Sequence, residues 1–145
     1  MSVREDIASH IVSTISGISS PSIKKVTRQP FQLDELSQQQ YPAVLIQTIE
    51  ETKEDQELGS GAKTRINVIE FGITAYVTAS ESNIDTERNT VASAIETELE
   101  SDITRNNKAL DTEVISIETD AGTLFPYGAV LMTVRVMYEH QSATP

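Results

Sequence analysis

The C-terminal segment YGAVLMTVRVMYEHQ, from Tyr127 to Gln141, constrains the fold most strongly. Its period-two alternation of apolar residues predicts a β-strand of about twelve residues, which is long for a globular domain. One row of side chains is apolar enough for an inner strand over a core: Val130, Met132, Val134, Val136 and Tyr138. The other row is mixed and gives a monomer no core, so it is a candidate contact surface: Ala129, Leu131, Thr133, Arg135 and Met137.

Two further segments predict amphipathic helices. In the first, Ser2 and Glu5 have the spacing of a capping box, and Gly17 suits a left-handed helix end. Its apolar stripe consists of Ile7, Ala8, Ile11, Val12 and Ile15. The second helix spans residues 82–102 and is capped by Ser82 or Asn83. Its core stripe consists of Ile84, Arg88, Val91, Ala92, Ile95 and Leu99.

Four more segments predict strands. Residues 21–28 form a weak edge strand whose lysines would blunt the edge. Residues 43–53 begin apolar on both faces and predict an inner strand, which an acidic loop joins as a hairpin to a long strand over residues 62–80. The fourth is a short strand at residues 113–120.

The strand at residues 62–80 changes parity along its length. Residues 69–77 alternate cleanly, but Ile66 and Val68 have the opposite parity. This predicts either a β-bulge or a first half that meets different neighbours from the second half.

The element order α-β-β-β-α-β-β predicts an α+β fold. We expect a two-layer sandwich in which two helices cover one face of a mostly antiparallel sheet of about five strands. Residues 1–140 form a single domain, and residues 141–145 form a flexible C-terminal tail. The uncovered face carries Ile66, Val68, Leu131 and Met137 among polar residues, which is too apolar for an idle surface.

The net charge of the chain limits the classes of partner that it can bind. With 22 acidic and 11 basic residues the net charge is −11, which opposes binding to nucleic acid and to anionic membranes. The absence of cysteine excludes disulfides and thiolate chemistry. Neither a signal peptide nor a membrane span is recognisable, so we expect a soluble protein that is made inside the cell.

No catalytic motif emerges. His10 and His140 stand apart from any partner that would make a catalytic or zinc site. Carboxylates gather near the hairpin loop, but without calcium-loop spacing: Glu50, Glu51, Glu54, Asp55 and Glu57. We expect no cofactor, no metal and no enzymatic activity, and a small metal-dependent hydrolase using these carboxylates stays the alternative from another class.

Basic residues form two small groups. Lys24, Lys25 and Arg28 share one predicted strand, and Lys63 and Arg65 lie at the start of another. Each group can pair with carboxylates of the same chain or with those of a neighbouring copy.

The layout resembles the tail terminator, or tail completion, proteins of long-tailed bacteriophages, the group that includes the minor tail protein U of phage lambda. The resemblance rests on YPAV at residues 41–44 after a polar connector, on residues 92–99 of the second helix, and on residues 128–138 of the last strand.

The resemblance implies a structural role at the head-proximal end of the tail in the virion. Members form a ring, usually a hexamer, that stops tube polymerisation and docks the neck. The implied partners are further copies of the chain, the tail tube protein, the neck or stopper protein and the sheath terminus. DNA would pass through the lumen without specific binding. A head–tail stopper, neck or other tail-associated ring protein is the alternative within the virion.

Such a role places function on surfaces. The candidate subunit or tube interface consists of Leu131, Arg135, Met137, Ile66, Val68, Lys63 and Arg65. The candidate flexible interface loop contains Glu54, Asp55, Glu57, Gly59 and Gly61.

Overall fold

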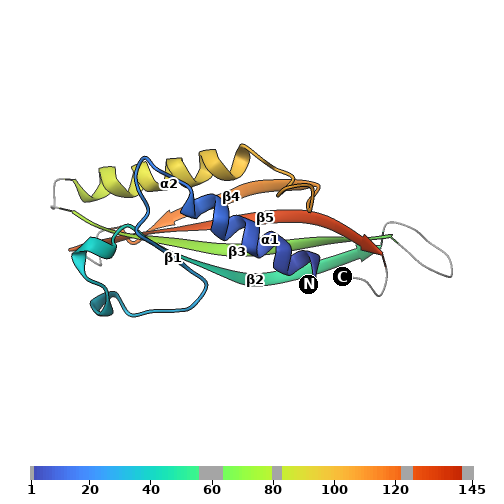
Figure 1. Cartoon of the computed structure of the whole chain (residues 1–145), viewed down its shortest axis with the longest axis horizontal. Helices are drawn as coiled ribbons and strands as arrows, with labels where there is room; N and C mark the ends of the chain where they lie inside the picture. The colour runs from blue at the N-terminus through green and yellow to red at the C-terminus, as the bar shows by residue number, and fades with distance from the viewer. Residues whose placement is uncertain (1, 56–63, 80–82, 122–125, 142–145) are drawn as a thin grey trace.

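A five-stranded sheet carries two helices on one of its faces (Figure 1). The computed structural model describes residues 2–55, 64–79, 83–121 and 126–141. The elements in chain order are α1 (Val3–Ser16), β1 (Lys25–Thr27), η1 (Leu33–Glu35), η2 (Gln38–Gln40), β2 (Ala43–Asp55), β3 (Thr64–Thr78), α2 (Ile84–Glu100), β4 (Asp111–Thr119) and β5 (Tyr127–Gln141). The α+β class and the predicted element order are confirmed.

The sheet order is β1-β2-β3-β5-β4, which places the predicted weak strand at an edge. That strand is shorter than expected, because β1 pairs with β2 in parallel over only three residues. All other pairs are antiparallel, and β3 lies between β2 and β5 along its whole length. Beyond Leu45, β2 therefore has no β1 neighbour.

The first helix begins as its sequence predicts but ends differently. The Ser2 hydroxyl accepts the Glu5 amide at 3.2 Å. Gly17 keeps a right-handed φ of −83°, so the predicted left-handed end is wrong. The reason is that its amide still donates to Ser13 O and Thr14 O, at 3.1 and 3.2 Å, and the last turn simply tightens.

The core stripe of α2 is confirmed, with all six predicted residues buried. Asn83 occupies the N-cap position, but its backbone is right-handed and its side chain makes no capping hydrogen bond, and the alternative cap, Ser82, lies outside the described residues. Arg88 is tolerated in the stripe because its guanidinium reaches Asp120 at 2.5 Å, beside the β4–β5 connection.

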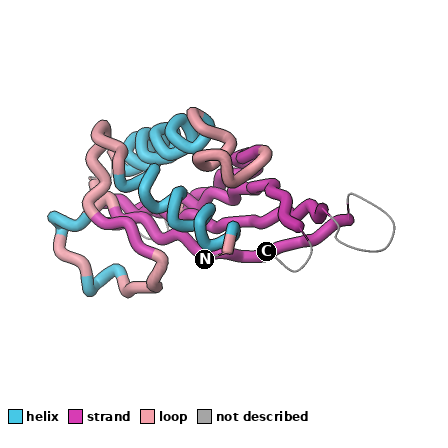
Figure 2. The backbone as a smooth tube through the Cα atoms, turned by 45° about the vertical axis from the view of Figure 1, so that its right-hand side comes forward, coloured by secondary structure: helices cyan, strands magenta, loops and turns pink. Residues whose placement is uncertain are grey.

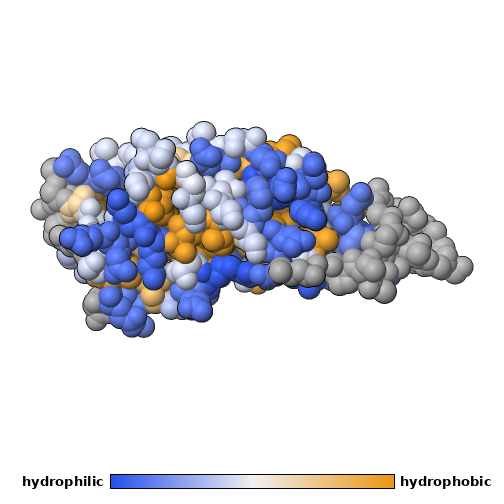
Figure 3. Space-filling model, viewed as in Figure 1, coloured by the Kyte–Doolittle hydropathy of each residue, from blue (hydrophilic) through white to orange (hydrophobic). Residues whose placement is uncertain are grey.

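The core lies between the helices and the facing side of the sheet. Figure 2 shows both helices on the same side of the strands. The predicted row of β5, from Val130 to Tyr138, is buried there together with Phe71 and the neighbouring apolar residues of β3. The side seen in Figure 3 includes α1 and is largely hydrophilic, with hydrophobic residues in small groups.

The predicted bulge lies in β2 rather than in β3. The β2–β3 register shifts between Thr48 and Glu50, which leaves Ile49 as an extra residue. The pairing of β3 with β5 continues without a shift, so Ile66 and Val68 face away from the helices while Asn67 takes the inner position. Polar Asn67 at an inner position explains the apparent parity change.

Candidate assembly surface

The side of the sheet that carries no helix is here named the outer face. Alternation along the strands defines it, because residues between the buried positions point the opposite way. In the described part it contains five of the predicted interface residues together: Ile66, Val68, Leu131, Arg135 and Met137.

The connector between β1 and β2 closes one end of the outer face. The Phe31 ring packs edge-on against Tyr76 of β3, with centroids 5.6 Å apart. Tyr41 lies 5.5 Å from Tyr127 of β5, centroid to centroid, and donates its hydroxyl to Leu33 O at 2.8 Å. Aromatic packing at this end therefore belongs to the fold of the single chain.

The middle of the outer face is open and apolar. Ile49 is 57% exposed and Leu131 is 38% exposed. Both reach over Gly72, where an added Cβ would lie 3.0 Å from Ile49 Cδ1 and 3.9 Å from Leu131 Cδ1. We name Ile49, Gly72 and Leu131 the Ile49 patch. Ile49 was not among the predicted interface residues, although alternation from the buried Val44 and Ile46 places it on this face, and the bulge changes the parity only of the residues beyond it.

A charged row crosses the sheet beside the Ile49 patch. The register aligns Glu50 of β2, Glu70 of β3, Arg135 of β5 and Glu113 of β4. Next to it, Val68 pairs with Met137, and both are half-buried. An apolar patch rimmed by charge has the composition of a specific contact surface.

The other predicted residues are not on this face or lie outside the described residues. Arg65 pairs with His140 and has the parity of the helix-covered face. Glu54 and Asp55 are the last residues of β2. Lys63, Glu57, Gly59 and Gly61 lie outside the described residues.

A polar cluster occupies the helix-covered face where the sheet runs past the N-terminus of α1. Arg4 contacts Glu51 through two hydrogen bonds of 2.7 and 3.1 Å. Tyr138 donates to Glu51 at 2.6 Å. Lys53 lies 3.0 Å from Glu51 and donates to Asn67 Oδ1 at 2.9 Å.

This cluster changes the interpretation of Glu51, which the sequence grouped with the acidic hairpin loop. Burial opposes its ionisation, but the hydrogen bonds from Arg4, Tyr138 and Lys53 outweigh burial and lower the pKa of Glu51 to about 2. Burial, together with its hydrogen bond to Glu51, raises the pKa of Tyr138 to about 12. Glu51 and Glu50 lie on opposite faces, so the two do not form a joint cation site.

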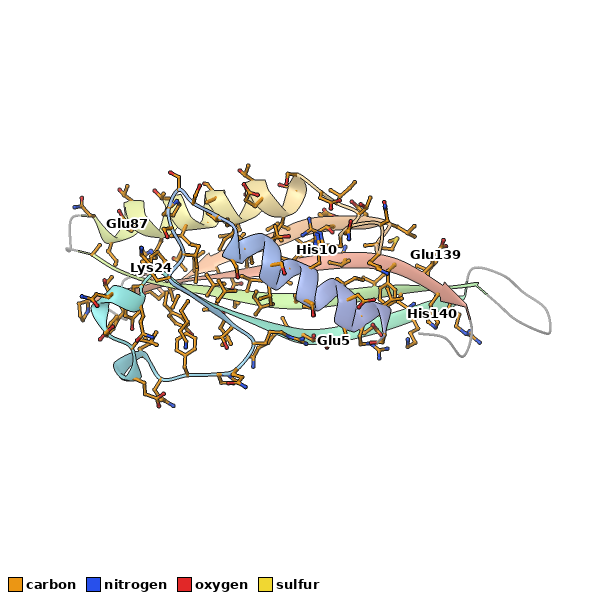
Figure 4. All side chains as sticks on the ribbon, viewed as in Figure 1. Glu5, His10, Lys24, Glu87, Glu139 and His140 are labelled. Atoms are coloured by element: carbon orange, nitrogen blue, oxygen red, sulfur yellow. The ribbon has the colours of Figure 1, made fainter. Side chains whose placement is uncertain are left out.

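The histidines lie far apart. Figure 4 shows His10 on α1 and His140 at the end of β5. The Asn67 amide lies 2.5 Å from His140 Nδ1. Burial and the nearby Arg105 lower the pKa of His10, which favours its neutral form. The described residues hold no group of three or more His, Asp and Glu placed for a metal ion.

Arg105 is a buried residue that the sequence did not predict. Its guanidinium donates to the carbonyls of Leu99 and Asp102 at the C-terminal end of α2. A cation there satisfies free carbonyl groups and complements the helix dipole. Positive φ values at Arg105, Asn106 and Asn107 form the turn that carries it back, and only the two asparagines signal this in the sequence.

Comparison with known proteins identifies the family. The family model described as Bacteriophage Tail Tube Terminator Protein matches residues 1–144. The chain belongs to the bacteriophage tail tube terminator family. The predicted resemblance is thereby confirmed, and this terminator is a structural component of a phage tail.

One solved structure similar to this terminator is a chain of the virion of a native gene transfer agent particle. The two chains share 10% identity with a TM-score of 0.41, and the alignment covers 96% of this chain and 92% of the other. A search of curated proteins finds no match. Within the described residues, neither helix of the terminator has the length and hydrophobicity of a membrane span.

Proposed function

We propose that this chain caps the head-proximal end of the tail tube, stops tube polymerisation and provides the docking surface for the neck. Membership of the tail tube terminator family over residues 1–144 carries the proposal. The function is thus one of contact surfaces within the virion, with several copies forming a ring, usually of six, around the tube end.

The outer face supports a contact role. Its Ile49 patch exposes two large apolar side chains that the monomer does not need for its core. Burying such side chains against the tube protein or a neighbouring copy stabilises a complex by about 25 cal/mol per Å² of apolar area. The charged row with Arg135 then fixes orientation more than affinity.

The acidic charge suits passage of DNA. A net charge of −11 gives a ring whose lumen repels phosphates, so DNA slides through without sticking. Retention of the assembled ring on DNA-cellulose at low salt would contradict this part of the proposal.

Electron microscopy of particles that lack the chain tests the function. Loss of a terminator leaves tails of uncontrolled length, and expression of the chain in trans restores uniform tails. Tails of normal length that do not join heads would instead identify a stopper or neck protein.

A further inference from the structure

The two outer edges of the sheet carry opposite charge. On the β1 side, Lys24, Lys25 and Arg28 fall within five residues, and residues 17–33 contain no acidic residue at all. This is unusual in a chain with twice as many acidic as basic residues. Lys24 is exposed and makes no ion pair with any described residue, and Figure 4 shows it on the β1 side of the molecule.

The β4 edge is acidic. Asp111, Glu113 and Glu118 are exposed along β4, and the strand contains no basic residue. The last turns of α2, which packs beside β4, add Glu98 and Glu100 as exposed carboxylates.

The remaining free edge does not match β4. From Ile46 onward β2 has no β1 partner. Up to Lys53 this stretch contains two carboxylates, Glu50 and Glu51, and one cation, Lys53 itself. Lys53 is already held 3.0 Å from Glu51. Placing this edge against β4 would bring carboxylates together, so charge selects the β1 edge.

The cations on the β1 side are held loosely. Lys25 lies 5.8 Å from the centroid of the Phe31 ring. Arg28 pairs with Glu5, but both side chains are more than a third exposed. Exposed pairs of this kind contribute little and can exchange partners.

We propose that the β1 edge of one copy binds the β4 edge of the next copy, through Lys24, Lys25 and Arg28 facing Asp111, Glu113 and Glu118. This proposal rests on the proposed function, in which several copies of the chain form a ring. Because β1 and β4 are the two opposite edge strands of the sheet, the contact is head-to-tail and repeats from copy to copy. A two-fold dimer would instead bring like charges together.

Complementary edges also solve an electrostatic problem. Copies with a charge of −11 repel one another, and only an orientation that pairs the basic edge with the acidic edge offsets this locally. At physiological salt such contacts act over about 8 Å, so the association weakens as salt rises.

Charge reversal tests the pairing in the full chain. Variant A carries Lys24→Glu and Lys25→Glu, so that both of its edges are acidic. Variant B carries Glu113→Lys and Glu118→Lys, so that the charge of β4 becomes net basic while the β1 edge stays basic. Each variant alone should self-associate at least about tenfold more weakly than the wild type in sedimentation velocity. A tenfold change in the dissociation constant is what the loss of a few exposed ion pairs adds up to. An equimolar mixture should recover association, because each edge of A then matches an edge of B, and the mean charge equals that of the wild type.

Controls separate the contact from folding and from total charge. Lys108→Glu matches the single variant Lys24→Glu in chemical change and in net charge, at an exposed site near Asp6 of α1 that is on neither edge, and should associate like the wild type. Lys24→Glu alone keeps the test informative should the change at Lys25 disturb Phe31. Circular dichroism melts check that each variant is folded.

Zero-length carbodiimide cross-linking of mixed ¹⁴N and ¹⁵N protein, free or on purified tails, should join Lys24 or Lys25 of one copy to a β4 carboxylate of another. The proposal is overturned if these cross-links are absent, if both variants associate like the wild type, or if the mixture fails to recover. If the variants still cap tails, the proposed edge contact is wrong and the proposed function still holds. If tails have normal length in the absence of the chain, the proposed function is wrong. The mixture of variants A and B would then still show whether the β1 and β4 edges bind each other.

Discussion

The side chain of Ile49 in β2 lies over Gly72 in β3, and a Cβ added to Gly72 would stand 3.0 Å from Ile49 Cδ1. Since Ile49 is 57% exposed, its side chain can rotate away into solvent. We expect Gly72→Ala to change the free energy of unfolding by less than about 0.5 kcal/mol, because nothing rigid opposes the methyl group. Urea denaturation measures this, and a loss above 1 kcal/mol, roughly twice the surface range, would contradict it.

Gly128 provides the contrasting case. A Cβ there would lie 2.9 Å from Ile84 Cγ1 and 3.2 Å from Arg88 Cδ, inside the core. Overpacking of this kind costs about 1–3 kcal/mol, so Gly128→Ala should lower the urea midpoint clearly below that of Gly72→Ala. Equal stability of the two variants would show that α2 moves freely over β5.

The outer face can be tested without disturbing the core. Arg135 is exposed and Met137 is half-buried, so Arg135→Glu with Met137→Asp should leave the monomer folded and abolish assembly on tails. A matched control is Lys108→Glu with Ile103→Asp, which changes an exposed cation and an exposed apolar residue away from this face. Assembly is scored by electron microscopy and folding by circular dichroism. Unfolding of the first variant would mean that both rows of β5 belong to a core.

Glu51 predicts an acid-dependent stability. Its pKa falls from 4.5 to about 2 on folding, so its contribution is complete above pH 4.5 and is lost as the pH falls towards 2. Glu51→Gln should lower the free energy of unfolding by about 2 kcal/mol at pH 7, and the gap from the wild type should close across that window. Glu50→Gln, on the other face, is the control and should cost less than about 0.5 kcal/mol. A gap that stays constant down to pH 2 would exclude the carboxylate as its source.

Arg88 and Asp120 form a buried pair, with side chains 6% and 5% exposed. Arg88→Met leaves Asp120 without its guanidinium partner and should cost about 3 kcal/mol. Asp120 also accepts the Ala129 amide at 3.0 Å, which an asparagine could still do. Arg88→Met with Asp120→Asn should therefore recover part of the loss in denaturant titrations. A double variant no more stable than Arg88→Met would indicate that the charge of Asp120 is not what the guanidinium offsets.

The spacing of apolar residues predicted those helices and strands in which one spacing continues from end to end. The stripe of α2 recurs without interruption, and so even Arg88 was placed correctly in the core. The inner row of β5 followed from alternation alone, since all its members share one parity.

Features that depend on two distant segments could not be read in this way. The bulge at Ile49 reverses the parity with which the later residues of β2 face the helices, and its position depends on where β3 accepts the extra residue. Glu51 looks like part of an acidic loop until Arg4 and Tyr138 come to it from other elements. Arg105 caps α2 only because the following turn reverses, which no side-chain period encodes.

The extra residue at Ile49 divides β2 into two stretches that evolve under opposite constraints. Before it, the even-numbered positions Val44 and Ile46 must remain apolar, whereas beyond it the odd-numbered positions face the helices. Substitutions in the strand are local events, but a change of length away from the bulge turns the following side chains to the other face. Loss of the extra residue at the bulge is the exception, because Glu50 would stay opposite Glu70 and Glu51 opposite Ile69, so homologues should differ in the length of β2 only at this position.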